Sequence, residues 1–341
     1  MENTMLKAAL IGFGGISRSH RKGYANLEKL GKVKLVCACD VNPEAFTKRV
    51  STNLDSSEEE PEESIRTYTD LSEMLEKESF DFADVCVPTF LHREITEKLL
   101  RSGHHVLCEK PMSLTYSDCT EMLKCAEECE RELMIGQCVR FYAAFDYLKE
   151  ALSDGRFGKP LGALFTRIST TPTWGWENWF MDPERSGGCI TDLHIHDIDV
   201  IRYLFGEPDA VSSRATSSVS LHDTVHTSLF YGSFPVTAVG DWSQLGVSFE
   251  AKCSVSLEAA TAVFDGKSLL IYPKDGTESY VAASESVSGY QAEIDYFCDV
   301  ITGKIKNTKN TARSAAETVR LIEHLRKSAE CGGKIIEFRA N

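Results

Sequence analysis

A short apolar run that leads straight into three glycines is the feature that most constrains the fold of this chain. Residues 6–11 (LKAALI) are followed by Gly12, Gly14 and Gly15, and a helical pattern begins near Ser17. A buried strand that turns tightly into a helix is typical of the first unit of a parallel α/β sheet. A tight turn could require the same glycines without binding any ligand, so the surrounding pattern decides how much they mean.

The same alternation of strand and helix continues through the first part of the chain. Further strands are predicted over residues 33–39, 82–87, 105–108 and 134–137. Helices are predicted over residues 17–30, 43–50, 69–77, 92–102 and 117–132. Continuous apolar strands that alternate with helices indicate a parallel sheet covered on both faces. The fold class is therefore α/β, and residues 1–138 are predicted to form a doubly wound, Rossmann-type domain.

The pattern changes after about residue 140. One helix is predicted over residues 144–152, and two more close the chain over 291–302 and 311–329. Between them, strands are predicted over residues 161–171, 211–219, 224–234, 236–245, 251–257, 262–264 and 268–272. Many of these strands alternate polar and apolar residues, which favours a large, mostly antiparallel sheet with one open face. Residues 139–341 are predicted to form this second α/β domain.

Composition narrows the range of partners. The formal net charge is −14, which argues against nucleic acid or an anionic membrane as the main partner. No apolar run is long enough to span a bilayer, and the first residues do not resemble a secretion leader. The twelve cysteines are therefore expected to stay reduced in a cytoplasm. Residues 51–64 carry six acidic residues and no basic one, which is typical of a solvated loop.

The glycine turn is a candidate site for a dinucleotide. Gly12 and Gly14 fill the first two positions of the G-x-G-x-x-G/A pattern, and Ser17 stands at the third. The phosphates would rest on the N-terminus of the helix that begins near Ile16. Asp40 ends the second strand, where a carboxylate binds ribose hydroxyls and repels a 2′-phosphate, so NAD is favoured over NADP. Alternatively, Asp40 caps the helix that follows Pro43.

A lysine follows the strand at residues 105–108. Glu109, Lys110 and Pro111 should lie at the carboxyl edge of the sheet, where open α/β folds bind ligands. A lysine there can donate a hydrogen bond to a substrate oxygen, or accept a proton if burial lowers its pKa. A surface lysine paired with Glu109 is the alternative.

A carboxylate and an imidazole are spaced for proton transfer further along the chain. Asp192 and His196 are four residues apart in GGCITDLHIHDID, so a helix would place them on one face. Such a pair moves protons near neutral pH. Helix capping by Asp192 is the alternative. His194 is predicted to be structural, and Asp199 is predicted to anchor the helix. A zinc site in this cluster lacks further spaced ligands, so no metal is predicted.

These motifs together resemble those of the Gfo/Idh/MocA oxidoreductases, a family that includes inositol dehydrogenases and glucose–fructose oxidoreductase. The similar segments are IGFGGISRSH, VCVPTFLH (residues 85–92), CEKP, VRF (residues 139–141) and GGCITDLHIHDIDVIRYLFGEP. They occur in the family's order across nearly the whole chain. Ser17 in the glycine motif, Cys189 where a third glycine is common, and the acidic segment depart from the family pattern.

The resemblance implies a Rossmann domain followed by a domain that binds substrate and whose open sheet packs against another subunit. A homodimer or homotetramer is therefore expected. It implies that Lys110, Asp192 and His196 are catalytic, and leaves open which of Lys110 and His196 is the base. The predicted cofactor contacts are Gly12, Phe13, Gly14, Gly15, Ile16, Asp40, Pro88, Thr89, His92, Glu109, Lys110 and Gln137. The predicted substrate contacts are Lys110, Arg140, Trp174, Trp176, Asn178, Trp179, Asp192 and His196.

The residues just before the Asp/His motif suggest a class of substrate. Tryptophan faces stack on the apolar faces of sugar rings, and Asn178 and Arg185 can bind hydroxyls or a carboxylate. Ordinary packing beneath a loop is the alternative for each tryptophan. The predicted reaction is hydride transfer between a nicotinamide and a CH–OH carbon of a sugar, sugar acid or cyclic polyol.

Two other functions fit the same residues. One is a glycoside-processing enzyme that keeps NAD bound and oxidises its substrate only transiently. The other is a non-catalytic cofactor sensor, against which the intact set of Lys110, Asp192 and His196 argues because a sensor need not keep a proton path.

Overall fold

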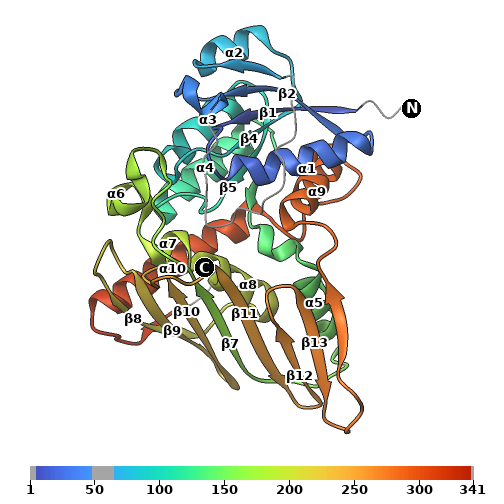
Figure 1. Cartoon of the computed structure of the whole chain (residues 1–341), viewed down its shortest axis with the longest axis vertical. Helices are drawn as coiled ribbons and strands as arrows, with labels where there is room; N and C mark the ends of the chain where they lie inside the picture. The colour runs from blue at the N-terminus through green and yellow to red at the C-terminus, as the bar shows by residue number, and fades with distance from the viewer. Residues whose placement is uncertain (1–4, 48–64, 339–341) are drawn as a thin grey trace. The chain divides into compact units, whose positions relative to one another are not determined.

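The computed structural model describes residues 5–47 and 65–338, which form two compact units (Figure 1). The first unit contains residues 1–138, 173–179 and 287–316, and the second contains residues 139–172, 180–286 and 317–341. The units separate at residue 138, where the sequence places its boundary, but each then includes segments from later in the chain. The predicted acidic loop at 51–64 lies outside the described residues.

The first unit is built on a six-stranded parallel sheet in the order β3-β2-β1-β4-β5-β6. The strands are β1 (Leu6–Ile11), β2 (Val33–Cys39), β3 (Arg66–Tyr68), β4 (Phe82–Val85), β5 (His105–Glu109) and β6 (Leu133–Gly136). The order reverses between β1 and β4, and open parallel sheets bind ligands beyond the carboxyl ends of such strands. The predicted doubly wound sheet is confirmed, with β3 as an added edge strand.

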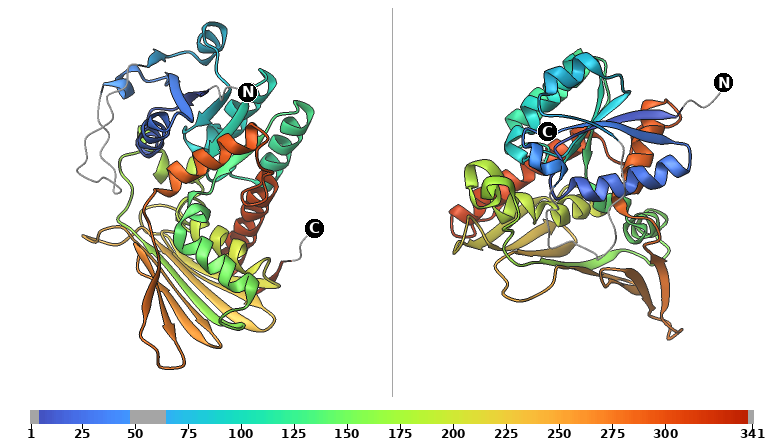
Figure 2. Two further views of the ribbon diagram at one scale, coloured as in Figure 1. Left: turned by 90° about the vertical axis from the view of Figure 1, so that its right-hand side faces the viewer. Right: turned by 45° about the horizontal axis from the view of Figure 1, so that its top comes forward.

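Helices cover this sheet and complete its core. They are α1 (Ser17–Lys29), α2 (Leu71–Lys77), α3 (His92–Arg101), α4 (Tyr116–Glu128) and α9 (Gly289–Ile301). Although α9 is more than 250 residues away in sequence, it packs against α1 (Figure 2). Ile294 and Phe297 of α9 are buried in one cluster with Leu10, Leu27 and Phe82. Between residues 43 and 47 there is only a single 3-10 turn, Pro43–Phe46, where a helix over 43–50 was predicted.

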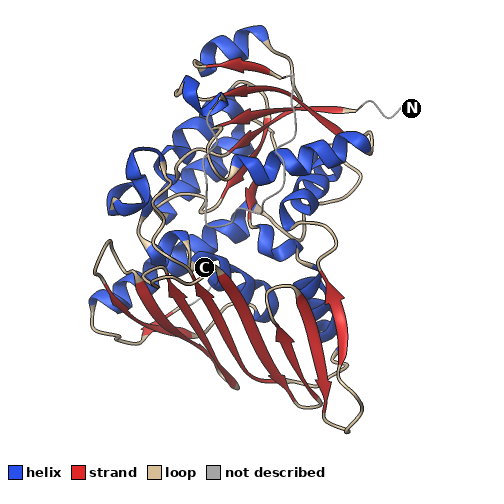
Figure 3. Ribbon diagram, viewed as in Figure 1, coloured by secondary structure: helices blue, strands red, loops and turns tan. Residues whose placement is uncertain are grey.

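The second unit is built on one nine-stranded sheet (Figure 3). Its strands are β7 (Pro160–Ile168), β8 (Ala210–Thr216), β9 (Thr224–Tyr231), β10 (Phe234–Asp241), β11 (Glu250–Leu257), β12 (Ala260–Phe264), β13 (Ser268–Pro273), β14 (Tyr280–Ser284) and β15 (Ile336–Glu337). Their order is β14-β13-β12-β11-β7-β10-β9-β8-β15, and among the described residues only β7 and β10 pair in parallel. The predicted, mostly antiparallel sheet is confirmed.

Burial alternates along these strands because only one face is packed against helices. Along β9, Val225, Thr227, Leu229 and Tyr231 are buried, while the residues between them are exposed or half-buried. Helices α5 (Ala143–Asp154) and α8 (Ile195–Phe205) pack against the sheet. The long helix α10 (Ala312–Glu330) passes from the first unit into the second. The other face carries exposed apolar side chains, among them Leu164.

All twelve cysteines lie in the described part of the chain as free thiols. Among the helices of residues 5–47 and 65–338, none combines the length and apolarity needed to cross a membrane.

Candidate functional site

Gly12 makes the sharp turn at the end of β1. Its φ of +91° is a conformation that side chains rarely adopt, and a Cβ there would lie 2.6 Å from the carbonyl oxygen of Cys86. The Gly12 N–H donates to the carbonyl of Cys39 at 2.8 Å, which ties the turn to β2. The tight-turn role predicted for Gly12 therefore has a steric basis.

Gly14, unlike the crowded Gly12, lies beside open space. A Cβ at Gly14 would meet no atom within 4 Å, so the backbone borders open space. Helix α1 begins three residues later, and its Arg18 and Ser19 N–H groups donate to the Gly15 and Ile16 carbonyls at 3.3 and 3.0 Å, so the N-terminal end of the helix dipole faces the glycine turn. Ser17 is buried and its hydroxyl donates to the Gly14 carbonyl at 2.7 Å, so the departure from glycine leaves no polar atom unpaired. These features suit a phosphate group at the helix N-terminus.

Asp40 holds the glycine turn from the neighbouring strand. One carboxylate oxygen accepts the Phe13 N–H at 2.7 Å and the other accepts the Asn42 N–H at 2.8 Å. The cap of the 3-10 turn at Pro43 is Asn42, whose side chain accepts the Glu44 N–H. The alternative in which Asp40 caps this turn is therefore wrong. Since each carboxylate oxygen accepts more than one hydrogen bond, Asp40 retains capacity for ribose hydroxyls.

Three predicted cofactor residues follow β4. Pro88 and Thr89 begin the 3-10 turn η2 (Thr89–Leu91), and His92 opens α3. The ring nitrogens of buried His92 lie 2.7 Å from the Pro111 carbonyl and 2.9 Å from the Val87 carbonyl. Burial lowers the pKa of His92. His92 thus links the segment after β4 to the segment after β5.

Gln137, a predicted cofactor residue, has a buried side-chain amide. It directly follows β6 at the carboxyl edge of the sheet and is 1% exposed. Its Nε2 has no hydrogen-bond partner among the described residues. A buried amide without a partner costs free energy unless a bound molecule supplies the acceptor.

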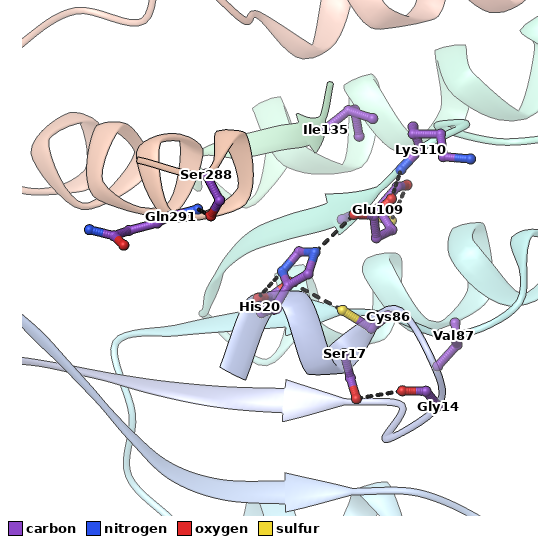
Figure 4. A network of polar contacts seen from close by, with 12 residues as sticks. Gly14, Ser17, His20, Cys86, Val87, Glu109, Lys110, Ile135, Ser288 and Gln291 are labelled. Atoms are coloured by element: carbon purple, nitrogen blue, oxygen red, sulfur yellow. Dashed lines mark hydrogen bonds and ion pairs between the residues drawn. The ribbon is translucent and has the colours of Figure 1, made fainter. Parts of the chain in front are cut away.

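Glu109 and Lys110 sit at the end of β5. Glu109 is buried, and its Oε2 accepts the Lys110 backbone N–H at 3.0 Å (Figure 4). The Lys110 side chain is half-buried. Three buried residues that touch or approach Glu109, namely His20, Asp84 and Glu293, were not singled out from the sequence. The available signal was an acidic residue, Asp84, within the apolar segment FADVCV.

In the second unit, Asp192 and His196 do not lie on one continuous helix. Asp192 ends the short helix α7 (Cys189–Asp192), and His196 is the second residue of α8. The Leu193 N–H donates to the Cys189 carbonyl as in an α-helix, and the His194 N–H donates to the same carbonyl five residues back, so the chain is locally widened between the two helices. Leu193 and His194 keep helical backbone angles, so the predicted shared face of Asp192 and His196 stays a prediction; both side chains are half-buried.

His194 is structural, as predicted. It is fully buried, its Nε2 lies 2.9 Å from the Thr227 hydroxyl, and burial lowers its pKa to about 3. A Cβ on Gly240 of β10 would lie 2.7 Å from the His194 ring, so the glycine makes room for the imidazole.

Asp199 anchors α8 through the predicted substrate residue Arg140. The guanidinium of Arg140 donates to both carboxylate oxygens of Asp199, at 2.7 and 2.6 Å, and both residues are buried. The Thr318 hydroxyl also donates to Asp199. This network gives Arg140 a structural role, and its predicted contact with substrate stays a prediction.

The predicted tryptophan cluster is divided between the units. Trp174, Trp176, Asn178 and Trp179 belong to the first unit, whereas Arg185 lies on α6 (Pro183–Ser186) of the second. Trp176 is 42% exposed, and Asn178 has a left-handed backbone with φ of 53°. Their proposed contact with a sugar ring stays a prediction.

A glycine turn at the switch point of a 3-2-1-4-5-6 sheet, followed by a large second sheet, defines a dinucleotide-binding oxidoreductase architecture. Residues 6–137 match the profile described as "Oxidoreductase family, NAD-binding Rossmann fold", and residues 145–277 match the "GFO/IDH/MocA C-terminal domain". The chain therefore belongs to the Gfo/Idh/MocA oxidoreductase family, which confirms the resemblance seen in the sequence.

Two of the relatives are named for reactions on sugars or sugar acids. The chain is 30% identical to D-apiose dehydrogenase of Paraburkholderia graminis over 70% of this chain and 60% of the relative. It is 32% identical to 2,7-anhydro-N-acetylneuraminate hydratase of Escherichia coli over 42% of this chain and 38% of the relative. Both alignments thus span less than two thirds of the relative.

Among solved structures, the fold resembles an oxidoreductase from Agrobacterium radiobacter in complex with NAD+, L-tartaric acid and magnesium. The TM-score is 0.81 over 98% of both chains, at 19% identity. At that identity the similarity supports the shared fold alone.

Proposed function

We propose that the protein is an NAD-dependent oxidoreductase that transfers hydride between nicotinamide and a CH–OH carbon of a sugar, sugar acid or cyclic polyol. The open space at Gly14, in front of the N-terminus of α1, is the observation that carries the proposal. Membership of the family and the sugar-related names of its relatives support the substrate class. A cytoplasmic location accompanies this proposal because all cysteines are free thiols.

The residues of the first unit suit NAD. The glycine turn offers backbone N–H groups to the pyrophosphate, and Asp40 offers a carboxylate to the ribose. The same charge disfavours the 2′-phosphate of NADP. The unpartnered amide of Gln137 offers a donor at the same edge of the sheet.

When bound, NAD would supply the hydride acceptor, so the chain's own residues must handle the proton. In substrate oxidation, the carbon-bound hydrogen leaves with both electrons of the C–H bond as hydride, and the hydroxyl proton passes to a base. We assign that base to His196 or Lys110, and leave the choice to experiment. Asp192 would orient His196 or bind a substrate hydroxyl. The other residue of the His196/Lys110 pair would donate a hydrogen bond to the oxygen that becomes a carbonyl.

The first experiment follows NAD reduction, and separately NADP reduction, by absorbance across inositols, aldoses, uronic acids and glycosides. Reduction of NAD by one compound class would support the proposal and identify the substrate. If no compound reduced NAD or NADP while NADH binding was measured in the same samples, net dehydrogenase activity would be contradicted.

Replacing Lys110 with alanine should lower turnover about 10²-fold or more, the scale of a lost general acid–base group. Steady-state kinetics with the substrate found above would measure this loss. Lys149→Ala is the matched control, because it removes a half-buried lysine that donates to a backbone carbonyl of α8. Equal turnover of Lys110→Ala and wild type would exclude Lys110 as the acid–base group and leave His196 as the base.

A second candidate is supported by the similarity to a hydratase of an anhydro sugar acid. An enzyme of this kind would keep NAD bound and oxidise its substrate only transiently. It would convert substrate without net absorbance change at the nicotinamide band. NMR analysis of products in the samples without absorbance change distinguishes an enzyme of this kind from an inactive protein.

We also propose that the chain forms a homodimer or homotetramer through the open face of the nine-stranded sheet. Support comes from the apolar side chains exposed on that face, including Leu164 on the central strand β7 and Phe230 on β9. Exposed apolar patches on a sheet commonly mark a protein interface.

A further inference from the structure

A buried polar cluster lies beneath the end of β5 in the first unit (Figure 4). The Nδ1 of His20 on α1 lies 2.7 Å from Asp84 Oδ2, and its Nε2 lies 2.9 Å from Glu109 Oε1. His20 and Asp84 are at most 1% exposed, and Glu109 is 4% exposed. A single imidazole therefore bridges carboxylates from two neighbouring strands.

The bridge requires a doubly protonated ring. A carboxylate oxygen only accepts hydrogen bonds, so both ring nitrogens must donate, and only the imidazolium has two N–H groups. Burial is the largest single effect and would lower the pKa of His20, but the charges and hydrogen bonds of Asp84 and Cys86 together outweigh it and raise this pKa well above 6.5. Asp84 also accepts a hydrogen bond from the Tyr24 hydroxyl at 2.9 Å, and this second contact fixes the position of its carboxylate.

These contacts continue from His20 through Glu109 to the backbone of Lys110. Glu109 uses Oε1 for His20 and Oε2 for the Lys110 backbone N–H, at 3.0 Å. Gly136, which pairs with Glu109 across β5 and β6, leaves space for this carboxylate, since a Cβ there would lie 3.2 Å from Oε1. The orientation of Glu109 is thus fixed on one side by His20 and bounded on the other by Gly136.

We propose that His20 is a positioning residue for Lys110: held by Asp84, it fixes Glu109, and Glu109 fixes the backbone at Lys110. This inference rests on the proposed function for the importance of Lys110, but the contacts themselves are independent of it. Small displacements of a reacting group cost large factors in rate, so a rigid anchor behind Lys110 has a kinetic value.

Glu293 on α9 completes the cluster as a neutral acid. It is fully buried, neither carboxylate oxygen has a hydrogen-bond partner among the described residues, and one lies within 4.8 Å of the facing His20 and Glu109 atoms. Burial first, and then the Glu109 charge, raises the pKa of Glu293 well above its usual value. A protonated Glu293 adds no third negative charge beside one imidazolium. The competing occupant is a divalent cation bound by His20, Glu109 and Glu293.

The test observes Lys110 directly. Lysines are reductively methylated with ¹³C-formaldehyde, the Lys110 signal is assigned by its loss in Lys110→Arg, and its shift is followed against pH. His20→Gln keeps a polar side chain but cannot donate to both carboxylates. We expect it to move and broaden the Lys110 signal. Tyr24→Phe is the matched control, because it removes a buried hydrogen bond to the same Asp84 yet spares the path to Lys110.

A second variant covers the case in which His20→Gln does not fold. Gly136→Ala removes no polar group but crowds Glu109, and it should move the Lys110 signal in the same way.

Glu109→Gln should keep the Lys110 signal closer to wild type than Glu109→Ala does, because a glutamine carbonyl still accepts a hydrogen bond from the Lys110 N–H. Where a substrate is known, His20→Gln should lower kcat about 10-fold or more, and change KM for NAD by less than about 3-fold.

Three outcomes would overturn the inference. One is an unchanged Lys110 signal in folded His20→Gln or Gly136→Ala, which would leave His20 with a role in stability alone. Another is equal displacement of the signal in Tyr24→Phe. The third is a stoichiometric divalent ion, found by elemental analysis of the purified protein and lost in Glu293→Gln, since the ion would then hold His20. The NMR readout needs no substrate, so an inactive wild type would contradict the proposed function and leave this test intact.

Discussion

At the scale of single residues, Gly12 and Gly14 belong to one motif but are required for different reasons. Gly12 is needed by the fold, because its left-handed backbone and the nearby Cys86 carbonyl both exclude a side chain. Gly14 has no such constraint within the protein: its φ is not in the left-handed region, and nothing would touch its Cβ. A glycine that the fold does not require, placed before a helix N-terminus, points to a ligand that approaches the backbone.

This difference gives a direct test of cofactor binding. Gly14→Ala should leave the melting temperature of the free protein nearly unchanged but weaken NADH binding about 10-fold or more, because one methyl group intrudes on the pyrophosphate. NADH fluorescence titration and thermal unfolding measure the two effects. Gly31→Ala is the control, since Gly31 has φ of +70° with open space around it and should lose only about 1–2 kcal/mol of stability. Unchanged NADH affinity in Gly14→Ala would contradict the proposed phosphate site.

Sequence patterns located the residues proposed to face a ligand better than those that support them. Gly12, Asp40 and Lys110 could be placed because each follows a predictable strand. His20 and Glu293 could not be placed, because their importance arises where α1, α9 and β5 meet. That meeting depends on long-range packing, which no local pattern encodes.

At the scale of secondary-structure elements, the break between α7 and α8 could not be predicted from the spacing of Asp192 and His196. No glycine or proline marks the break at Leu193 and His194, so the local sequence reads as a continuous helix. The break is associated with burial of the His194 ring against Gly240 and Thr227 of the sheet. Tertiary packing thus overrides helical periodicity at this point.

Burial of His194 predicts a pH dependence of stability. Its pKa is about 3 in the folded protein and about 6.5 when unfolded, so between these values the unfolded chain binds the extra proton. Stability should therefore fall as pH falls below about 6.5. Between about pH 7 and pH 5, wild type should lose about 2 kcal/mol more than His194→Gln.

Urea unfolding at the two pH values measures the free energies for wild type and His194→Gln. Ser228→Ala serves as the control, since Ser228 is an exposed residue on β9 and the change neither adds nor removes a titratable group. If His194→Gln lost as much stability as wild type on acidification, the buried neutral histidine would not be the cause.

At the scale of the whole molecule, the sequence predicted the two kinds of sheet and most of their strands. Continuous apolar runs gave the parallel sheet, and alternation gave the antiparallel one. The edge strands β3, β14 and β15 were missed, because they are short and their side chains are mostly exposed or half-buried. The return of α9 to the first unit was also missed, since its amphipathic pattern shows that it packs but not against which element.

The open face of the nine-stranded sheet leads to a prediction about assembly. Leu164 on β7, the central strand, is 47% exposed, and its cross-strand partner Thr237 on β10 is half-buried on the same face. Burying such a face between two copies would remove apolar area from water, at about 25 cal/mol per Å². A glutamate at the centre would place an unpaired charge in that interface, which is strongly unfavourable.

Leu164→Glu should therefore convert the proposed dimer or tetramer to smaller species at micromolar concentration, as measured by sedimentation velocity. Leu245→Glu introduces the same charge at a leucine that is 93% exposed in the segment between β10 and β11, and should leave assembly unchanged. Wild-type protein that sediments only as a monomer would contradict the interface outright. An oligomer that resists Leu164→Glu would show that the chain assembles through another surface, because a buried carboxylate at the middle of the sheet could not be accommodated without loss of affinity.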